Sequence, residues 1–271
     1  MSGQLPTLRD VIRRHQLDAR RKLGQHFLLD SNITARIARA AGDLAGRHVV
    51  EVGPGPGGLT RALLDTPVAD VTAIELDPRA ATAGRELAEA FPGRLRLIEG
   101  DAIGMDLAAL VQAPRQIVAN LPYNVGSPLL VGWLRQAAMW ERLTLMFQQE
   151  VAERICAAPD TEDYGRLSVL AQYCCRCHVV LRLPPEAFTP PPKVWSAVIV
   201  LQPHPDQPAP ALLTAMERVT AAAFGQRRKM LRQSLKALGG ETLLDRAGIV
   251  ATRRAETLSV AEFAGLAALV G

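Results

Sequence analysis

A short motif carries the most specific chemistry in the sequence. The apolar run Ile117 to Ala119 predicts a strand that delivers Asn120-Leu121-Pro122-Tyr123 at its end. The Asn120 side-chain oxygen and the Leu121 carbonyl can each accept an N–H of an amino group, and Tyr123 offers a ring on which a base can stack. This arrangement suits methylation of an exocyclic nitrogen, with catalysis mainly by positioning. A plain Asn-x-Pro-x-Asn turn is the structural alternative.

A glycine-rich loop indicates the methyl donor. Gly53-Pro54-Gly55-Pro56-Gly57-Gly58 follows the apolar run His48 to Val52 and precedes a helical pattern. It satisfies the G-x-G-x-x-G pattern of dinucleotide-binding folds. Pro54 and Pro56 have no backbone N–H, however, and a pyrophosphate requires such donors. S-adenosylmethionine has no phosphate, so the loop favours this cofactor, with a nicotinamide-dependent dehydrogenase as an alternative.

Two carboxylates follow the next two predicted strands. Glu75 stands about 20 residues after the loop, where an acid meets ribose hydroxyls in this fold. Asp101 follows the strand Leu95 to Ile98 and could accept a hydrogen bond from the cofactor's adenine amine. Asp101 could equally be the N-cap of a short turn.

A proline-rich segment holds another aromatic residue. In Phe188-Thr189-Pro190-Pro191-Pro192 the prolines predict a rigid, extended loop. Such a loop can hold Phe188 out as a second stacking surface for a flipped base. The alternative is that Phe188 is a core side chain beneath the loop.

The elements that position these residues alternate between strand and helix. This order predicts an α/β fold: a Rossmann-like, S-adenosylmethionine-dependent methyltransferase sheet with helices on both faces, and a small C-terminal all-α domain. We expect strands that include 71–74, 143–147, 171–183 and 194–202. The predicted domains are a basic arm (1–22), a catalytic domain (23–202), a proline-rich linker (203–211) and a helical domain (212–271), to which the family resemblance described below assigns rRNA binding.

A basic row in the C-terminal part suggests a nucleic-acid contact. Arg228, Arg232 and Lys236 recur at four-residue spacing, so one helix would place them on a common face. A row of cations suits a phosphate backbone, although a solvated face is the alternative.

Composition adds weaker constraints. The 271 residues carry a net charge of +4, which allows a polyanionic partner without requiring one. The four cysteines lack the spacing of a zinc site, so we expect buried structural thiols and no metal. Free thiols and the absence of a signal peptide indicate the cytoplasm, and no apolar run is long enough to span a membrane. Nothing requires more than a monomer.

Taken together, the motifs resemble the small-subunit rRNA adenine dimethyltransferase family. The resemblance extends from about Lys22 to the C-terminus. It rests on Leu23-Gly24-Gln25-His26-Phe27-Leu28, the glycine loop, Glu75-Leu76-Asp77, Gly100-Asp101-Ala102, Asn120 to Asn124, Tyr164 to Ser168, Phe188 to Lys193 and Gln226 to Lys229. It implies dimethylation of two adjacent adenosines in the 3′-terminal hairpin of 16S rRNA, within a 30S assembly intermediate.

The resemblance also implies residue roles. Glu75 would hold the cofactor's ribose, Asp101 its adenine, and Gly53 would pack against it. Asn120 would lie between cofactor and target amine. Gln25, His26 and Leu28 would close over the cofactor. Tyr123 and Phe188 would stack the target adenine.

Three positions depart from the family pattern, and two rival functions remain. His26 stands where Asn is common, Gln149 where Lys is common, and Trp195 replaces a usual Asp. One rival is a large-subunit rRNA adenine methyltransferase of the macrolide-resistance type, which usually has Ile at the position of Leu121. The other is an RNA-binding assembly factor with little catalytic use.

Overall fold

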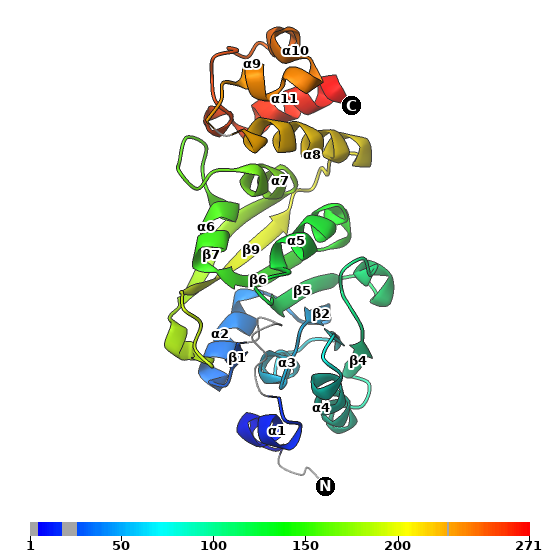
Figure 1. Ribbon diagram of the computed structural model, residues 1–271. Coiled ribbons are helices and arrows are strands. Elements are labelled where there is room, and N and C mark those ends of the chain that lie inside the picture. The colour runs from blue at the N-terminus through cyan, green and yellow to red at the C-terminus, as the bar shows by residue number, and fades with distance from the viewer. Residues whose placement is uncertain (1–4, 18–25, 227) are drawn as a thin grey trace. The chain divides into compact units, whose positions relative to one another are not determined.

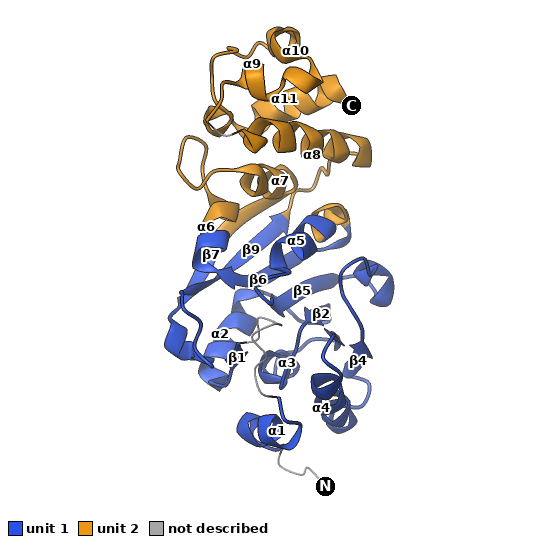
Figure 2. Ribbon diagram, in the orientation of Figure 1, with its two compact units in different colours: residues 1–132, 139–152, 179–202 blue, residues 133–138, 153–178, 203–271 orange. Residues whose placement is uncertain are grey.

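The structure, a computed structural model, describes residues 5–17, 26–226 and 228–271 (Figure 1). The chain divides into two compact units (Figure 2). Unit 1 comprises Met1–Gly132, Met139–Ala152 and Val179–Gln202, and unit 2 comprises Trp133–Ala138, Glu153–His178 and Pro203–Gly271. Residues 153–178, which the sequence pattern assigns to the catalytic domain, therefore group by contact with the C-terminal helices. The predicted domain boundaries stay a prediction.

Seven strands form one sheet in the order β4-β3-β2-β5-β6-β9-β7. Neighbours from β4 to β6 are parallel, and β9 is antiparallel to β6. The chain order reverses at β2, because β3 and β4 extend the sheet on one side and β5 and β6 on the other. Ligands bind beyond the carboxyl ends of the strands at such a switch point. The strands are β2 (His48–Val52), β3 (Asp70–Glu75), β4 (Leu95–Glu99), β5 (Arg115–Asn120), β6 (Arg142–Gln148), β7 (Cys175–Leu183) and β9 (Ser196–Pro203). The predicted α/β sheet is confirmed.

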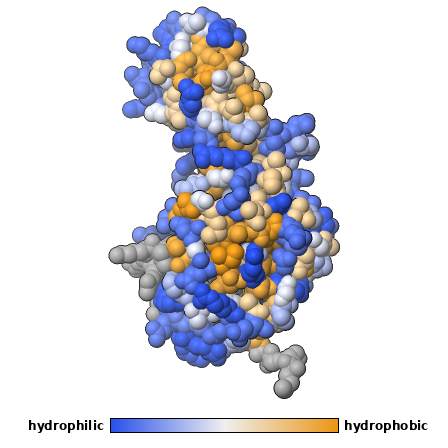
Figure 3. All heavy atoms as spheres, turned by 90° about the vertical axis from the view of Figure 1, so that its right-hand side faces the viewer, coloured by the Kyte–Doolittle hydropathy of each residue, from blue (hydrophilic) through white to orange (hydrophobic). Residues whose placement is uncertain are grey.

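Helices around the sheet begin at recognisable caps. Asp30 caps α2 by accepting the Asn32 N–H at 2.8 Å, and Asp77 caps α4, which has Pro78 at its first position. Apolar side chains of these helices pack with the strands in one core. The helices before Cys156 are α1 (Leu8–Arg14), α2 (Ser31–Ala40), α3 (Gly58–Leu64), α4 (Pro78–Ala90), α5 (Gly126–Leu134) and α6 (Gln149–Cys156). On the face of unit 1 drawn in Figure 3, apolar residues gather at the centre and hydrophilic ones surround them.

Unit 2 contains a small helical core. The Phe224 ring packs between Tyr164 and Phe263, at centroid distances of 6.1 and 5.6 Å. The helices of this unit are α7 (Arg166–Cys174), α8 (Pro210–Gly225), α9 (Leu231–Ser234), α10 (Gly240–Arg246) and α11 (Val260–Val270). The predicted C-terminal helical region is confirmed.

The strand predicted over 171–183 is wrong in its first part. Residues up to Cys174 belong to α7, and β7 begins at Cys175. The Ser168 hydroxyl accepts the Gly165 N–H at 3.0 Å at the start of α7. Val169 and Leu170 are buried on its inner side. Helix capping and burial therefore make residues 171–174 helical, although their composition also fits a strand.

The single helix predicted for the basic row is also wrong. Of residues 228–236, only 231–234 are α-helical, and a short 3-10 turn starts at Lys236. The Leu231 N–H donates to the Arg253 carbonyl at 2.8 Å and the Arg232 N–H to the Ala251 carbonyl at 3.1 Å. These contacts replace the hydrogen bonds that would extend a helix backwards from Leu231. Arg228 and Lys236 therefore do not share a helix face with Arg232.

Candidate active site

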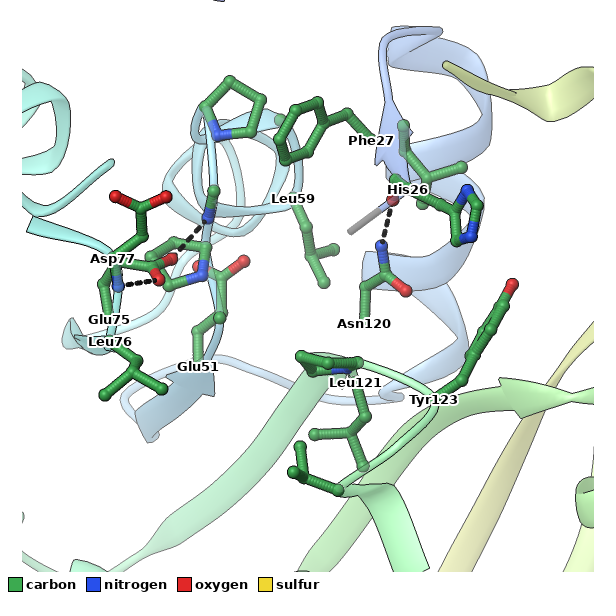
Figure 4. Close-up of a pocket in the computed structure, with 18 of the residues that line it drawn as sticks. His26, Phe27, Glu51, Leu59, Glu75, Leu76, Asp77, Asn120, Leu121 and Tyr123 are labelled. Carbon is green, nitrogen blue, oxygen red and sulfur yellow. Dashed lines mark hydrogen bonds between the residues drawn. The ribbon is translucent and has the colours of Figure 1, made fainter. Parts of the chain in front are cut away.

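A cavity of about 890 Å³, its open mouth included, lies at the carboxyl ends of β2, β3 and β5 (Figure 4). Strand ends, the glycine loop and one short N-terminal segment converge there. Its lining comprises residues 26–28, Glu51, 53–56, 58–59, 75–77 and 120–125. Elements far apart in the chain thus bring together six of the residues predicted for the site: His26, Leu28, Gly53, Glu75, Asn120 and Tyr123.

The glycine loop presents bare backbone to this cavity. Gly53 has a φ of +72°, a backbone conformation that residues with a side chain rarely adopt. Its N–H donates to the Ile74 carbonyl at 2.9 Å. A Cβ at Gly58 would lie 2.6 Å from the Leu28 carbonyl oxygen, so β1 (Phe27–Leu28) packs directly on the start of α3. A ligand can therefore approach the backbone closely on one side, while Leu28 closes the other.

Glu75 ties the loop to β3. One carboxylate oxygen accepts the Gly55 N–H at 3.0 Å and the other accepts the Asp77 N–H at 2.8 Å (Figure 4). Burial raises the pKa of this carboxyl, and the two backbone donors oppose that shift. Each oxygen retains a lone pair, so Glu75 can still accept hydroxyl groups from a ligand in the cavity.

A second carboxyl was missed by sequence reasoning. Glu51 lies within β2, is only 1% exposed and lines the cavity. Its Oε2 has no hydrogen-bond partner among the described residues, and burial raises its pKa to about 8. The signal was present as an acid inside the apolar run His48 to Val52, because a buried strand accepts a carboxyl only at a cost.

Asn120 and Tyr123 form the other wall. The Asn120 side-chain N–H donates to the His26 carbonyl at 3.3 Å, an orientation that leaves its amide oxygen to accept from a ligand. The Tyr123 ring packs against the His26 ring in a tilted arrangement at a centroid distance of 5.4 Å, and its hydroxyl lies 2.7 Å from that of Ser196. Burial raises the pKa of Tyr123. The tyrosine ring is therefore fixed on two sides at the cavity wall.

His26 is held from both sides of its chain. Its ring Nδ1–H donates to the Pro190 carbonyl at 2.8 Å, while its own carbonyl accepts from Asn120. The side chain thus points toward the proline-rich loop. Gln25, also predicted to close over the cofactor, lies outside the described residues.

Phe188 is not held out by the loop as predicted, and its proposed role in stacking a base stays a prediction. It is 3% exposed and packs in the core of unit 1. The short strand β8 (Phe188–Thr189) pairs antiparallel with β1, with Leu28 opposite Phe188. This pairing turns the ring inward, so the alternative reading as a core side chain holds.

Asp101 lies outside the cavity lining. Its side chain is exposed and accepts the Ile103 N–H at 2.9 Å, which is the turn-capping arrangement foreseen as its alternative. The predicted contact with a cofactor's adenine stays a prediction.

The cations of the basic row are exposed but gather differently from the prediction. Lys229, Arg232 and Lys236 line a second hollow in unit 2, whereas Arg228 is exposed outside that lining. Arg232 lies 3.5 Å from Glu241, which partly neutralises it. The hollow therefore offers a cluster of three cations rather than a linear row.

The cysteine thiols do not form a further site in the part of the chain that the structure describes. All four thiols are free, and burial raises the pKa of Cys156 to about 11 and of Cys174 to about 12. Within residues 5–17, 26–226 and 228–271, no group of three or more His, Cys, Asp or Glu side chains could hold a metal ion. No helix in those ranges is long and apolar enough to cross a membrane.

Known proteins resemble this chain over nearly its whole length. The family model for ribosomal RNA adenine dimethylase matches residues 16–270. A ribosomal RNA small subunit methyltransferase A from Gluconobacter oxydans is 66% identical, covering 98% of this chain and 88% of that protein. The protein of the same name from Paramagnetospirillum magneticum is 58% identical, covering 98% and 95% respectively.

Solved structures are similar as well. The 23S rRNA methyltransferase ErmE is 28% identical, with a TM-score of 0.66 over 90% of this chain and 99% of that one. A dimethyladenosine transferase from Plasmodium falciparum has a TM-score of 0.74 over 89% of this chain and 96% of that one. At 24% identity, the latter likeness shows a shared fold.

Proposed function

The chain belongs to the ribosomal RNA adenine dimethylase family, and we propose that it dimethylates two adjacent adenosines in the 3′-terminal hairpin of 16S rRNA. The similarity to two small-subunit methyltransferases supports this substrate over large-subunit rRNA. We place the activity in the cytoplasm, on a 30S assembly intermediate, with the enzyme acting as a monomer.

The cavity fits S-adenosylmethionine. Two buried carboxyls, Glu51 and Glu75, face a ligand that carries cationic groups and ribose hydroxyls, and Glu51 has an oxygen without a partner among the described residues. Gly53 allows close approach of the backbone, and Leu28 supplies apolar cover. When bound, the cofactor supplies an electrophilic methyl group. In this proposal Glu75 accepts hydrogen bonds from the ribose hydroxyls, and Glu51 faces the ammonium group. Asp101 accepts a hydrogen bond from the adenine amine at the outer side of the cavity.

The opposite wall holds the target. The Asn120 side-chain oxygen and the Leu121 carbonyl each accept one N–H of the adenine amine, which turns the nitrogen lone pair into the cavity. Tyr123 supports the base by stacking. Because the amine nitrogen becomes acidic once it carries a further substituent, its proton can leave to water without a strong base. Positioning then accounts for most of the rate.

The cation cluster of unit 2 supports binding of the RNA backbone. Lys229, Arg232 and Lys236 line one hollow, and Arg228 adds a fourth exposed cation nearby in the sequence. Exposed cations of this kind bind phosphates without reading sequence. In this proposal the cluster holds the subunit while unit 1 performs the chemistry.

The observation that carries the proposal is the convergence of Asn120, Leu121 and Tyr123 on a cavity that also contains Gly53 and Glu75. It is tested by mixing the purified protein and labelled S-adenosylmethionine with unmodified 30S and, separately, unmodified 50S subunits. Nucleosides are then identified by mass spectrometry. Dimethyladenosine from the 30S reaction alone is expected. Product from 50S subunits alone, or cofactor binding without any product, would overturn the proposed substrate or the proposed reaction.

A further inference from the structure

An exposed tryptophan stands in front of the first residue of β9. Trp195 exposes 49% of its surface, whereas the other two tryptophans, Trp133 and Trp140, are buried at 4% and 3%. The strand begins at Ser196 and not at the predicted Val194, so residues 194 and 195 are not covered by strand pairing. Lys193, Val194 and Trp195 thus expose one cation and two large apolar side chains in succession.

Hydrogen bonds at both ends hold this segment to the cavity wall. At its start, the His26 ring donates to the Pro190 carbonyl at 2.8 Å. At its end, the Ser196 hydroxyl lies 2.7 Å from that of Tyr123, and the Trp195 carbonyl accepts the Gln149 N–H at 2.9 Å. His26 and Tyr123 both line the cavity. Trp195 directly precedes Ser196, so its backbone lies next to the cavity wall, although its side chain is not part of the cavity lining.

The exposed segment 193–195 suits RNA next to the target base as its ligand. A target base that enters the cavity leaves its stack, and its neighbours along the RNA then lie unpaired outside. Unpaired bases stack on exposed aromatic rings, and their phosphates attract cations. Trp195 offers such a ring and Lys193 such a cation, on a segment that the three prolines 190–192 also stiffen.

We infer that Trp195 is a stacking platform for a nucleotide next to the target adenosine, and that Lys193 meets the adjoining phosphate. The inference rests on the proposed function and adds an RNA-positioning residue outside the cavity. Trp195 touches neither the cofactor nor the target amine in this account. Its effect should therefore appear in substrate binding and leave the chemical step unchanged.

Kinetics on unmodified 30S subunits test this inference. We expect Trp195→Ala to raise the KM for subunits roughly tenfold, the scale of one lost base–aromatic stack. The kcat and the cofactor Kd should stay unchanged, and Trp195→Phe should restore most of the affinity. Met139→Ala is the matched control. Met139 is similarly exposed, but it precedes the first residue of β6, whereas Trp195 lies near the last residue of that strand. This control variant should match the parent enzyme.

A photo-crosslink supplies a readout that a structural role would not move. With benzoylphenylalanine in place of Trp195, irradiation should crosslink the protein to rRNA next to the methylated adenosines, as mapped by reverse transcription. The same replacement of Met139 should give no crosslink there. An unchanged KM for Trp195→Ala, or a position 195 that crosslinks no rRNA, overturns the inference while the parent still methylates 30S subunits. A parent that methylates no rRNA overturns the proposed function first.

Discussion

The Asn120 side-chain amide donates to the backbone carbonyl of His26 at 3.3 Å, although the two residues are 94 positions apart in the chain. This contact joins the end of β5 to the segment that enters β1. It fixes which way the Asn120 oxygen points, and the His26 ring in turn packs against Tyr123. The N-terminal segment therefore orients the residue that we propose to hold the target amine, without itself taking part in the chemistry.

The start of α3 tolerates no side chain. We expect Gly58→Ala to destabilise the protein by roughly 1–3 kcal/mol and to weaken cofactor binding, because the new methyl would push the Leu28 carbonyl away from the cavity. Chemical unfolding and cofactor titration measure the two effects. Gly132→Ala in α5 is the control: nothing lies within 4 Å of its Cβ, so it should be neutral or stabilising. Equal behaviour of the two variants would contradict the packing argument.

Glu51 makes stability depend on pH. Its pKa is raised from the ordinary 4.5 to about 8, so between these values the folded state holds a proton that the unfolded state releases. The stability contributed by this group therefore falls as pH rises from about 4.5 to about 8. Glu51→Gln should remove that slope, and the variant should exceed the parent in stability by a growing margin toward pH 8. Unfolding free energies of parent and variant measured at pH 5, 6.5 and 8 test this expectation. A stability difference that stayed constant over this range would contradict it, because Glu51 would then already be ionised in the folded protein at pH 5.

Tyr123 offers a test of stacking against hydrogen bonding. Tyr123→Phe keeps the ring and loses the contact with Ser196, so we expect methyl transfer within a few-fold of the parent. Tyr123→Ala removes the ring and should lower kcat/KM about tenfold or more, the scale of one lost stack. Steady-state rates on 30S subunits decide between these outcomes. If both variants lost activity equally, the hydroxyl contact would be the important one.

The cation cluster of unit 2 should govern salt-dependent binding. Lys229→Glu or Lys236→Glu is expected to weaken 30S binding and to reduce the slope of log K against log salt by roughly 0.7–0.9 per lost phosphate contact. Cofactor affinity should not change. Glu241→Gln should strengthen binding, because it releases Arg232 from its ion pair.

The matched control for this cluster is Arg246→Glu, which reverses an exposed charge on α10 outside the hollow. It should alter binding less than either lysine reversal does. A uniform effect of all three reversals would indicate long-range charge attraction instead of a local phosphate site.

Sequence reasoning succeeded where a local pattern determines the outcome. The glycine loop and the strand ends bearing Glu75 and Asn120 follow from short motifs with one favoured geometry. These features placed the cavity at the correct edge of the sheet. They did so because the carboxyl ends of neighbouring parallel strands necessarily meet there.

The failures concern residues whose environment is set by distant parts of the chain. Phe188 turns inward because β8 pairs with β1, and the basic row breaks because Leu231 and Arg232 bond to residues 253 and 251. Glu51 was a visible signal, as an acid within an apolar strand pattern, but that pattern does not show which cavity or neighbour the carboxyl faces. None of these pairings is encoded in a short stretch of sequence.

The most direct test of the account replaces Asn120 and follows a single turnover on 30S subunits with saturating cofactor. Asn120→Ala should slow methyl transfer roughly 100-fold or more, because the amine loses its alignment, while cofactor affinity changes only a few-fold. Asn120→Asp, which keeps an acceptor oxygen but cannot donate to the His26 carbonyl, should fall between Ala and the parent. A parent-like rate for Asn120→Ala, in a variant with normal thermal stability, would contradict the role assigned to this residue.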